Sequence, residues 1–231
     1  MNNHNLLNLL RLPAALALGL VISAISLKAP GTLIQPEASP PWLPAAITHL
    51  IMWVLSILII VLLSRGNPAE YGFTKGDFRL TGGIFLWVVP TAILSTLGFI
   101  ASRSGVELKG GLGYSPFQTI IFVWIYATVS EEIFTRGLLQ SYLIPLTKYG
   151  IDLSKGLRLS LPVIFSGLYF GMMHIVAIKK MGPPVILLTT LLGLVAGYYR
   201  EKTKSLIPAM IIHSLFNIGG SLPMWILSRI I

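Results

Sequence analysis

Cysteine is absent from this chain, and charged residues are scarce. The absence of cysteine excludes disulfides, thiolate metal sites and a cysteine nucleophile. Charged residues make up 11% of the chain, whereas ordinary soluble domains carry about 25%. Hydrophobic residues make up 54%, and the mean hydropathy is +0.79. This composition predicts an all-α polytopic membrane protein, because the apolar runs are long and continuous.

Acidic residues are also few, so the formal net charge is +9. In a soluble protein, that excess would suggest binding to nucleic acid. Here the basic residues lie mostly in short segments between apolar runs, as the positive-inside distribution of membrane proteins requires. We therefore expect the lipid bilayer as a partner and no nucleic acid.

Seven apolar runs predict a bundle of seven transmembrane helices, since a helix needs about 20 residues to cross a bilayer. The fourth run is too long for one straight span, and a break near Gly137 would give eight helices instead. The first run is interpreted as a signal anchor, with a cleaved signal peptide as the alternative. The runs are residues 10–27, 42–64, 81–101, 116–146, 161–178, 184–199 and 206–226.

The connections between these runs predict an orientation in the membrane. Ten Lys and Arg residues fall in the connections on the side of the N-terminus, and six fall on the other side. This bias predicts a cytoplasmic N-terminus in a plasma (inner) membrane protein. Within one membrane domain, residues 1–74 form N-terminal transmembrane helices and a cytoplasmic loop. Residues 75–231 form the part that carries the chemistry described next.

Six strongly polar side chains within the apolar spans are candidates for function. An ionisable group at the bilayer centre costs roughly 2.5–3.5 kcal/mol on insertion scales, and such groups mark function by default. They are therefore expected to face the bundle interior and to find partners there. The six are Glu131, Glu132 and Arg136 in the fourth run, His174 in the fifth, and His213 and Asn217 in the seventh.

Helical spacing predicts how these groups are arranged. Glu132 and Arg136 are four residues apart, so they share a face and can pair. Glu131 lies about 100° round the same helix and can point into a cavity. His213 and Asn217 are also four apart and can line that cavity together. Each group has a structural alternative, since an ion pair can join helices and a buried histidine can bond a backbone carbonyl.

The combination of residue types suggests hydrolysis of an amide by an activated water. A buried carboxylate can take and return a proton, and a neighbouring histidine can share that task. A second histidine and an amide can donate hydrogen bonds to a developing oxyanion. No cofactor is assigned, although Glu131, His174 and His213 would make a three-ligand zinc site despite the absence of an HExxH motif. A non-enzymatic proton or ion relay, or a scaffold, is the alternative function.

Three motifs carry a family resemblance. EExxxR, FxxxH and HxxxN occur here in that order, each without substitution. Together they resemble the CAAX protease and bacteriocin-processing family (CPBP, or Abi) of intramembrane proteases, with residues 75–231 as the protease core. The matching residues are Glu131, Glu132 and Arg136, then Phe170 and His174, then His213 and Asn217.

The resemblance implies a role for each residue and an activity. Glu131 would be the base that activates water with His174, while His213 and Asn217 would form the oxyanion hole. Glu132 and Arg136 would pair and support the site. The implied enzyme is an endopeptidase, glutamate-dependent or metallo, that cleaves a lipidated or membrane-embedded peptide in a cavity open to the cytoplasm. An immunity protein without enzymatic activity remains an alternative within such a family.

Overall fold

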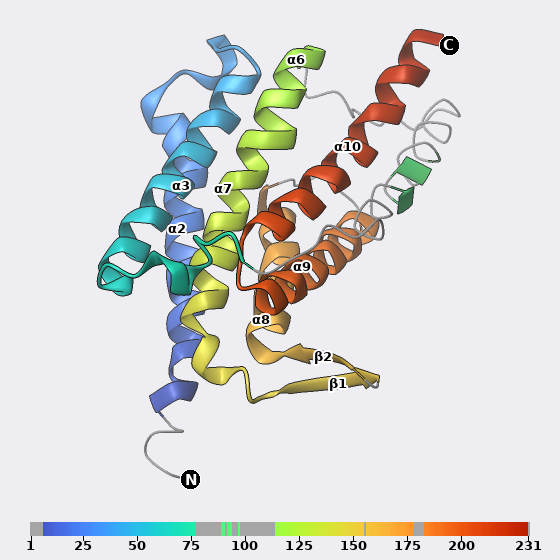
Figure 1. Cartoon of the computed structure of the whole chain (residues 1–231). Helices are drawn as coiled ribbons and strands as arrows, with labels where there is room; N and C mark the ends of the chain where they lie inside the picture. Colours follow the sequence, from blue (N-terminus) through green and yellow to red (C-terminus); the bar gives the residue numbers. More distant parts are fainter. Residues whose placement is uncertain are drawn as a thin grey trace.

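A bundle of helices with one short β-hairpin makes up the computed structural model of this chain (Figure 1). The structure describes residues 7–76, 114–154, 156–177 and 183–230, together with positions 89, 90, 92, 93 and 97. The predicted span at residues 81–101 lies almost wholly outside the described residues.

The element bounds agree with most of the remaining predicted spans. The first two long helices are α2 (Arg11–Leu33) and α3 (Trp42–Ser64), and the last three are α8 (Leu161–Ala177), α9 (Pro183–Thr203) and α10 (Ile207–Ile230). Between them, one continuous helix comprises α6 (Pro116–Gln118), η3 (Thr119–Ala127), α7 (Thr128–Glu132) and η4 (Ile133–Gln140), where η3 and η4 are π-helical. Short 3₁₀ turns are η1 (Pro36–Ala38), η2 (Pro68–Tyr71) and η5 (Ile144–Leu146).

Three helices among the described residues are long and apolar enough to cross a membrane: Leu7–Leu33, Trp42–Ser64 and Pro116–Gln140. A shorter apolar helix runs from Leu161 to Ile175. Large apolar side chains such as Leu62 and Phe117 are more than two-thirds exposed on the long helices, as expected for surfaces that face lipid. The chain is thus an all-α integral membrane protein in class, while the number of seven or eight spans stays a prediction.

The fourth predicted run is one unbroken helix as far as Gln140. The alternative of a break near Gly137 is not seen in this helix, because Gly137 lies inside the π-helical segment η4 and is buried against neighbouring elements. The helix ends a few residues later, where Pro145 stands in the 3₁₀ turn η5. A proline cannot continue the helical hydrogen bonds, so the end of the run is set there rather than at the glycine.

The β-hairpin was not predicted. Strand β1 (Gly150–Ser154) pairs antiparallel with β2 (Leu157–Ser160), and Gly150 lies opposite Ser160. Gly156 in the turn has a φ of +92°, a conformation that glycine adopts readily. The hairpin lies at the same end of the bundle as the N-terminus, away from the C-terminus (Figure 1).

The core surrounds the C-terminal half of the continuous helix that begins at Pro116, which we call the central helix; this half consists of α7 and η4. This helix lies between α3 and α10 in Figure 1, and it also packs against α8 and α9. The packing is apolar but includes several polar side chains that are fully buried. The largest side chains with almost no exposure include Phe134, Leu138, Phe170, Ile212, Glu132 and Arg136.

Gly193 permits a close approach of α8 and α9. A Cβ atom at this position would lie 2.8 Å from the backbone of Gly167 on α8. The sequence predicts such packing from the pair Gly193 and Gly197, and the structure confirms it for Gly193. The contact also matters for the polar core, because the Gly193 carbonyl accepts a hydrogen bond of 3.0 Å from Arg136.

We expect Gly193→Ala to destabilise the protein by about 1–3 kcal/mol, because the new methyl group meets backbone atoms that cannot move aside without separating the helices. The matched control is Gly220→Ala on α10, where nothing lies within 4 Å of the added Cβ. That change should be neutral or stabilising, by roughly 0.5–1 kcal/mol from helix propensity alone. Thermal unfolding of both variants in detergent measures the difference, and equal midpoints would contradict the assignment of Gly193.

Candidate active site

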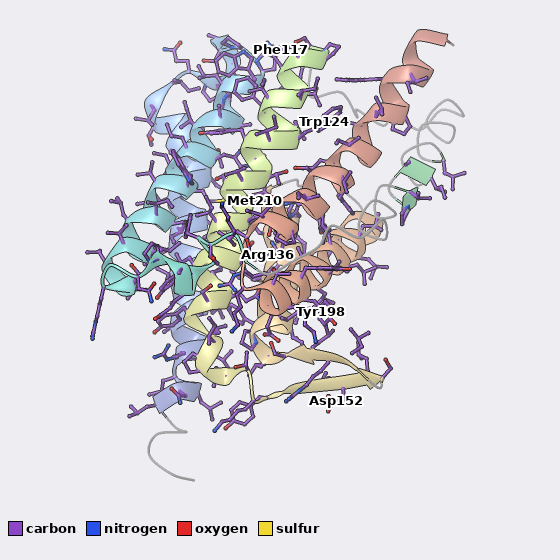
Figure 2. All side chains as sticks on the ribbon, in the orientation of Figure 1. Phe117, Trp124, Arg136, Asp152, Tyr198 and Met210 are labelled. Carbon is purple, nitrogen blue, oxygen red and sulfur yellow. The ribbon has the colours of Figure 1, made fainter. Side chains whose placement is uncertain are left out.

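Glu132 and Arg136 form a fully buried ion pair at the centre of the bundle. Arg136 Nη1 lies 3.1 Å from Glu132 Oε1, and both side chains have 0% exposure. Figure 2 shows Arg136 in the middle of the molecule, surrounded by helices. The spacing of four residues predicts this pair, because it depends only on the helix that carries both residues.

The guanidinium of Arg136 joins three helices. Its Nη1 donates to Thr135 Oγ1 in addition to Glu132, and its Nη2 donates to the Gly193 carbonyl on α9. Its Cζ atom lies 4.5 Å from the centre of the Phe170 ring on α8, a cation–π contact. A buried charge requires several such partners to be tolerated. Arg136 thus acts as a structural anchor as well as the counter-ion of Glu132.

His213 connects α10 to both carboxylates. Its Nδ1 lies 2.9 Å from Glu132 Oε1, and its Nε2 lies 3.7 Å from Glu131 Oε2. A carboxylate oxygen can only accept, so Nδ1 carries a proton and donates it to Glu132. The Nε2 contact is too long for a hydrogen bond in this state. His213 is therefore held firmly by Glu132 and directs its other nitrogen towards Glu131.

Phe170 explains the first position of the FxxxH motif. Its ring centre lies 4.6 Å from that of His174 and 5.3 Å from that of His213, besides the contact with Arg136. The Phe170 carbonyl also accepts a hydrogen bond of 2.8 Å from His174 Nδ1. Because that nitrogen donates, Nε2 of neutral His174 carries no proton and can accept one. The motif therefore sets both the position and the tautomer of His174.

Glu131 and Glu132 have different surroundings although they are adjacent. The side chain of Glu131 retains 12% exposure, while that of Glu132 has none. Glu131 contacts two imidazoles, with His49 Nε2 at 3.0 Å from its Oε1 and His213 Nε2 at 3.7 Å from its Oε2. Two carboxylates in such different environments are suited to two different roles.

Asn217 lies on α10 close to the central helix, but its amide points elsewhere in this structure. Its Nδ2 donates to the Val123 carbonyl and to Thr128 Oγ1, at 3.1 Å each. These two bonds use both amide hydrogens and fasten α10 to η3 and α7. The predicted role of Asn217 at an oxyanion stays a prediction, and it requires at least one of these bonds to be exchanged.

His49 was missed by the sequence analysis. It lies on α3, within an apolar run that the sequence identifies as a span. The rule that selected the other residues, an ionisable side chain inside a span, would also have selected His49. It carries no motif, however, and nothing local indicates which helix it faces. Its contact with Glu131 comes from the packing of α3 against α7.

The donor types for zinc are present around Glu131, but their arrangement is not that of a metal centre. Among the residues that the structure describes, no three His, Asp or Glu side chains are grouped so as to hold a metal ion. Of the predicted ligands Glu131, His174 and His213, the last already engages Glu132 through Nδ1 and leaves only Nε2 for a metal.

A cleft of about 560 Å³ opens near the hairpin end of the bundle, but it contains none of the six predicted site residues. Its lining includes Arg11, Tyr142 and Arg200. Arg200 is almost fully buried and donates to the Glu70 carbonyl and to Ser141 Oγ. The cleft is thus separate from the Glu131 cluster, and the predicted opening of the site to the cytoplasm stays a prediction.

A comparison with protein families finds a match to a model described as "Type II CAAX prenyl endopeptidase Rce1-like", over residues 113–219. The match contains all three motifs and therefore confirms the resemblance to the CAAX proteases. His49 lies outside it. Searches of curated proteins and of solved structures found no match.

Proposed function

We propose that this chain hydrolyses peptide bonds of lipidated or membrane-embedded peptides. The premise is that residues 113–219 belong to the Rce1-like family of type II CAAX prenyl endopeptidases. The family indicates a protease, and the apolar helices make it a membrane protein. The proposal also specifies the nucleophile that cleaves the peptide bond and the class of substrate. A water activated by Glu131 and His174 is the nucleophile, and a prenylated peptide that enters from the bilayer is the substrate.

One observation carries this proposal: Glu131 is a buried carboxylate with residual exposure, and it contacts the imidazoles of His49 and His213. A base must be reached by water, and Glu131 keeps 12% of its side chain exposed while Glu132 keeps none. His174 offers a second acceptor, because its Nδ1 proton is already donated to Phe170. General bases of this kind typically contribute a factor of about 10²–10⁴ to the rate.

The proposed reaction moves one proton through the site. Glu131, assisted by His174 Nε2, takes a proton from water as the water oxygen attacks the carbonyl carbon of the scissile bond. The carbonyl oxygen becomes an oxyanion, and the proton then passes from Glu131 to the leaving nitrogen as the C–N bond breaks. No covalent enzyme intermediate is formed.

His213 and Asn217 are the proposed donors to the oxyanion, and each meets a condition set by its contacts. The Nδ1 proton of His213 is held by Glu132, so donation through Nε2 requires the doubly protonated ring. Asn217 must exchange a bond to Val123 or Thr128 for one to the oxyanion. We expect substrate entry to cause both changes. Donors directed at the developing negative charge stabilise it most in a site that excludes water.

The test uses purified full-length protein in detergent or in vesicles. We expect cleavage of a farnesylated peptide ending in a CAAX sequence, and much weaker cleavage of the same peptide without the lipid, since the lipid delivers the substrate to the membrane. A known member of the family serves as the positive control. If that member cleaves the peptides and this protein cleaves neither the prenylated peptide nor a membrane-tethered one, the proposal is wrong.

A strong zinc chelator is expected to leave this activity unchanged, because the proposed chemistry uses only side chains. Activity is measured before and after prolonged incubation with the chelator and again after adding zinc. Loss of cleavage that zinc restores would instead assign Glu131, His174 and His213 to a metal, with the metal-bound water as nucleophile.

A further inference from the structure

The contact between His49 and Glu131 links α3 to the proposed base, and α3 lies outside the family match. Two hydrogen bonds join α3 to the central helix near this contact. Ser130 Oγ donates to the His49 carbonyl at 2.7 Å, and Tyr126 Oη donates to the Ala46 carbonyl at 3.2 Å. The position of the His49 ring relative to Glu131 is therefore set by the backbone of α3.

The protons on the His49 ring follow from its two partners. Nδ1 lies 2.7 Å from the Ala45 carbonyl, which can only accept, so Nδ1 carries a proton. Nε2 lies 3.0 Å from Glu131 Oε1, and that contact needs a proton as well. Either an imidazolium donates to a carboxylate, or a carboxylic acid donates to a neutral imidazole. In both states the pair holds one shared proton and has no net charge.

This pairing gives each adjacent carboxylate its own partner. Glu132 has Arg136, a permanent cation sealed from solvent. Glu131 has His49, a partner that can gain and lose a proton, and both of these side chains keep some exposure, 12% and 17%. An unpaired carboxylate in a membrane interior is costly. A permanent cation would stabilise the anion strongly, whereas an imidazole stabilises it and can still share a proton.

We propose that His49 is a positioning residue for the base: it holds the carboxylate of Glu131 in one orientation and supplies the counter-charge that keeps it anionic before water is activated. Oε1 stays bonded to His49 while Oε2, on the side of His213, receives the proton from water and returns it to the leaving nitrogen. The proton of His49 is not transferred. This role rests on the proposed function, and it makes α3 part of the active site rather than only a membrane anchor.

The kinetic test compares His49→Ala and His49→Gln with the wild type on the farnesylated peptide. We expect His49→Ala to lower kcat by about tenfold to a hundredfold, as misplacement of a reacting group does, with KM changed less than about twofold because His49 is not proposed to bind substrate. The glutamine of His49→Gln can still donate a hydrogen bond to Glu131 but carries no charge, so the kcat of this variant should lie between those of the wild type and His49→Ala. Added imidazole should restore part of the activity of His49→Ala, whereas pyrrole, of similar size, should not.

Tyr126→Phe is the matched control for helix packing. It removes a hydrogen bond between the same two helices, but it keeps the ring that contacts His49 and does not touch Glu131. Its kcat should stay near that of the wild type. If Tyr126→Phe lowers kcat as much as His49→Ala does, the effect comes from helix packing and the inference is wrong.

A second readout does not depend on activity. The ring nitrogens of His49, labelled with ¹⁵N, should show a strongly hydrogen-bonded Nε2 in the wild type that changes in Glu131→Gln. Unchanged resonances would overturn the pair itself. An active wild type with an equally active His49→Ala would overturn only the role of His49, whereas a wild type inactive on every peptide would overturn the proposed function.

Discussion

Glu131→Gln is expected to abolish peptide hydrolysis while leaving the protein folded. The substitution keeps the size of the side chain and an oxygen that can accept from His49, but it removes the group that takes a proton from water. Loss of a general base lowers rates by about 10²–10⁴-fold, and here the same group also delivers the proton to the leaving nitrogen. The farnesylated peptide assay measures the loss, and thermal unfolding verifies the fold.

Two control variants sharpen this prediction. Glu70→Gln alters an exposed glutamate of η2 that lies outside the site, and it should leave activity unchanged. Glu132→Gln keeps an acceptor for Arg136 and His213 but loses the charge, so it should weaken stability as well as activity. If Glu131→Gln stays active while Glu132→Gln is inactive but stable, the roles of the two carboxylates are reversed.

Arg136→Met is expected to cause the largest loss of stability, about 3–5 kcal/mol, because it leaves Glu132 as a buried charge without its cation. The methionine fills much of the volume of the arginine stem, so an empty space contributes little to the loss. The change also removes the bond to the Gly193 carbonyl, which would then be buried without that donor. Thermal unfolding and denaturant titration in detergent measure the effect.

The control for this prediction is an ion pair of the same type in a different environment. Arg158 Nε lies 3.7 Å from Asp152 Oδ1 in the hairpin, where the side chains are 48% and 81% exposed. Such surface pairs contribute little, so Arg158→Met should hardly change the midpoint of unfolding. The double variant Arg136→Met, Glu132→Met should recover part of the lost stability, because it removes both buried charges. Equal midpoints for Arg136→Met and Arg158→Met would show that the buried pair is not the anchor.

Local patterns in the sequence were enough to predict several helices and one ion pair. The apolar run at residues 42–64 coincides with α3, since its length and composition leave no alternative. The Glu132–Arg136 pair needed only the helical repeat. The break near Gly137, kept as an alternative, is not seen because a glycine weakens a helix only when packing does not compensate, and Gly137 is buried against other elements.

Contacts between helices could not be predicted from local sequence patterns. Nothing in the sequence indicates that His213 donates to Glu132. Nor does it indicate that the Asn217 amide donates to Val123 and Thr128 instead of lining a cavity together with His213. Those contacts depend on the rotation and depth of α10 against the central helix. Shifting a helix by one residue turns its side chains by about 100°, which would redirect every one of these groups.

By itself, the sequence determined the membrane class of this protein, the motifs that resemble those of the CAAX proteases, and the Glu132–Arg136 pair. This was possible because burying a charge in a bilayer is costly, so each such residue is expected to have a partner or a function. Only the tertiary structure decided which side chain from another helix meets Glu131. Glu132 is sealed with Arg136, and Glu131 meets His49 from a helix 82 residues earlier in the chain. The contact between His49 and Glu131 arises from packing between helices, which no spacing within a single helix encodes.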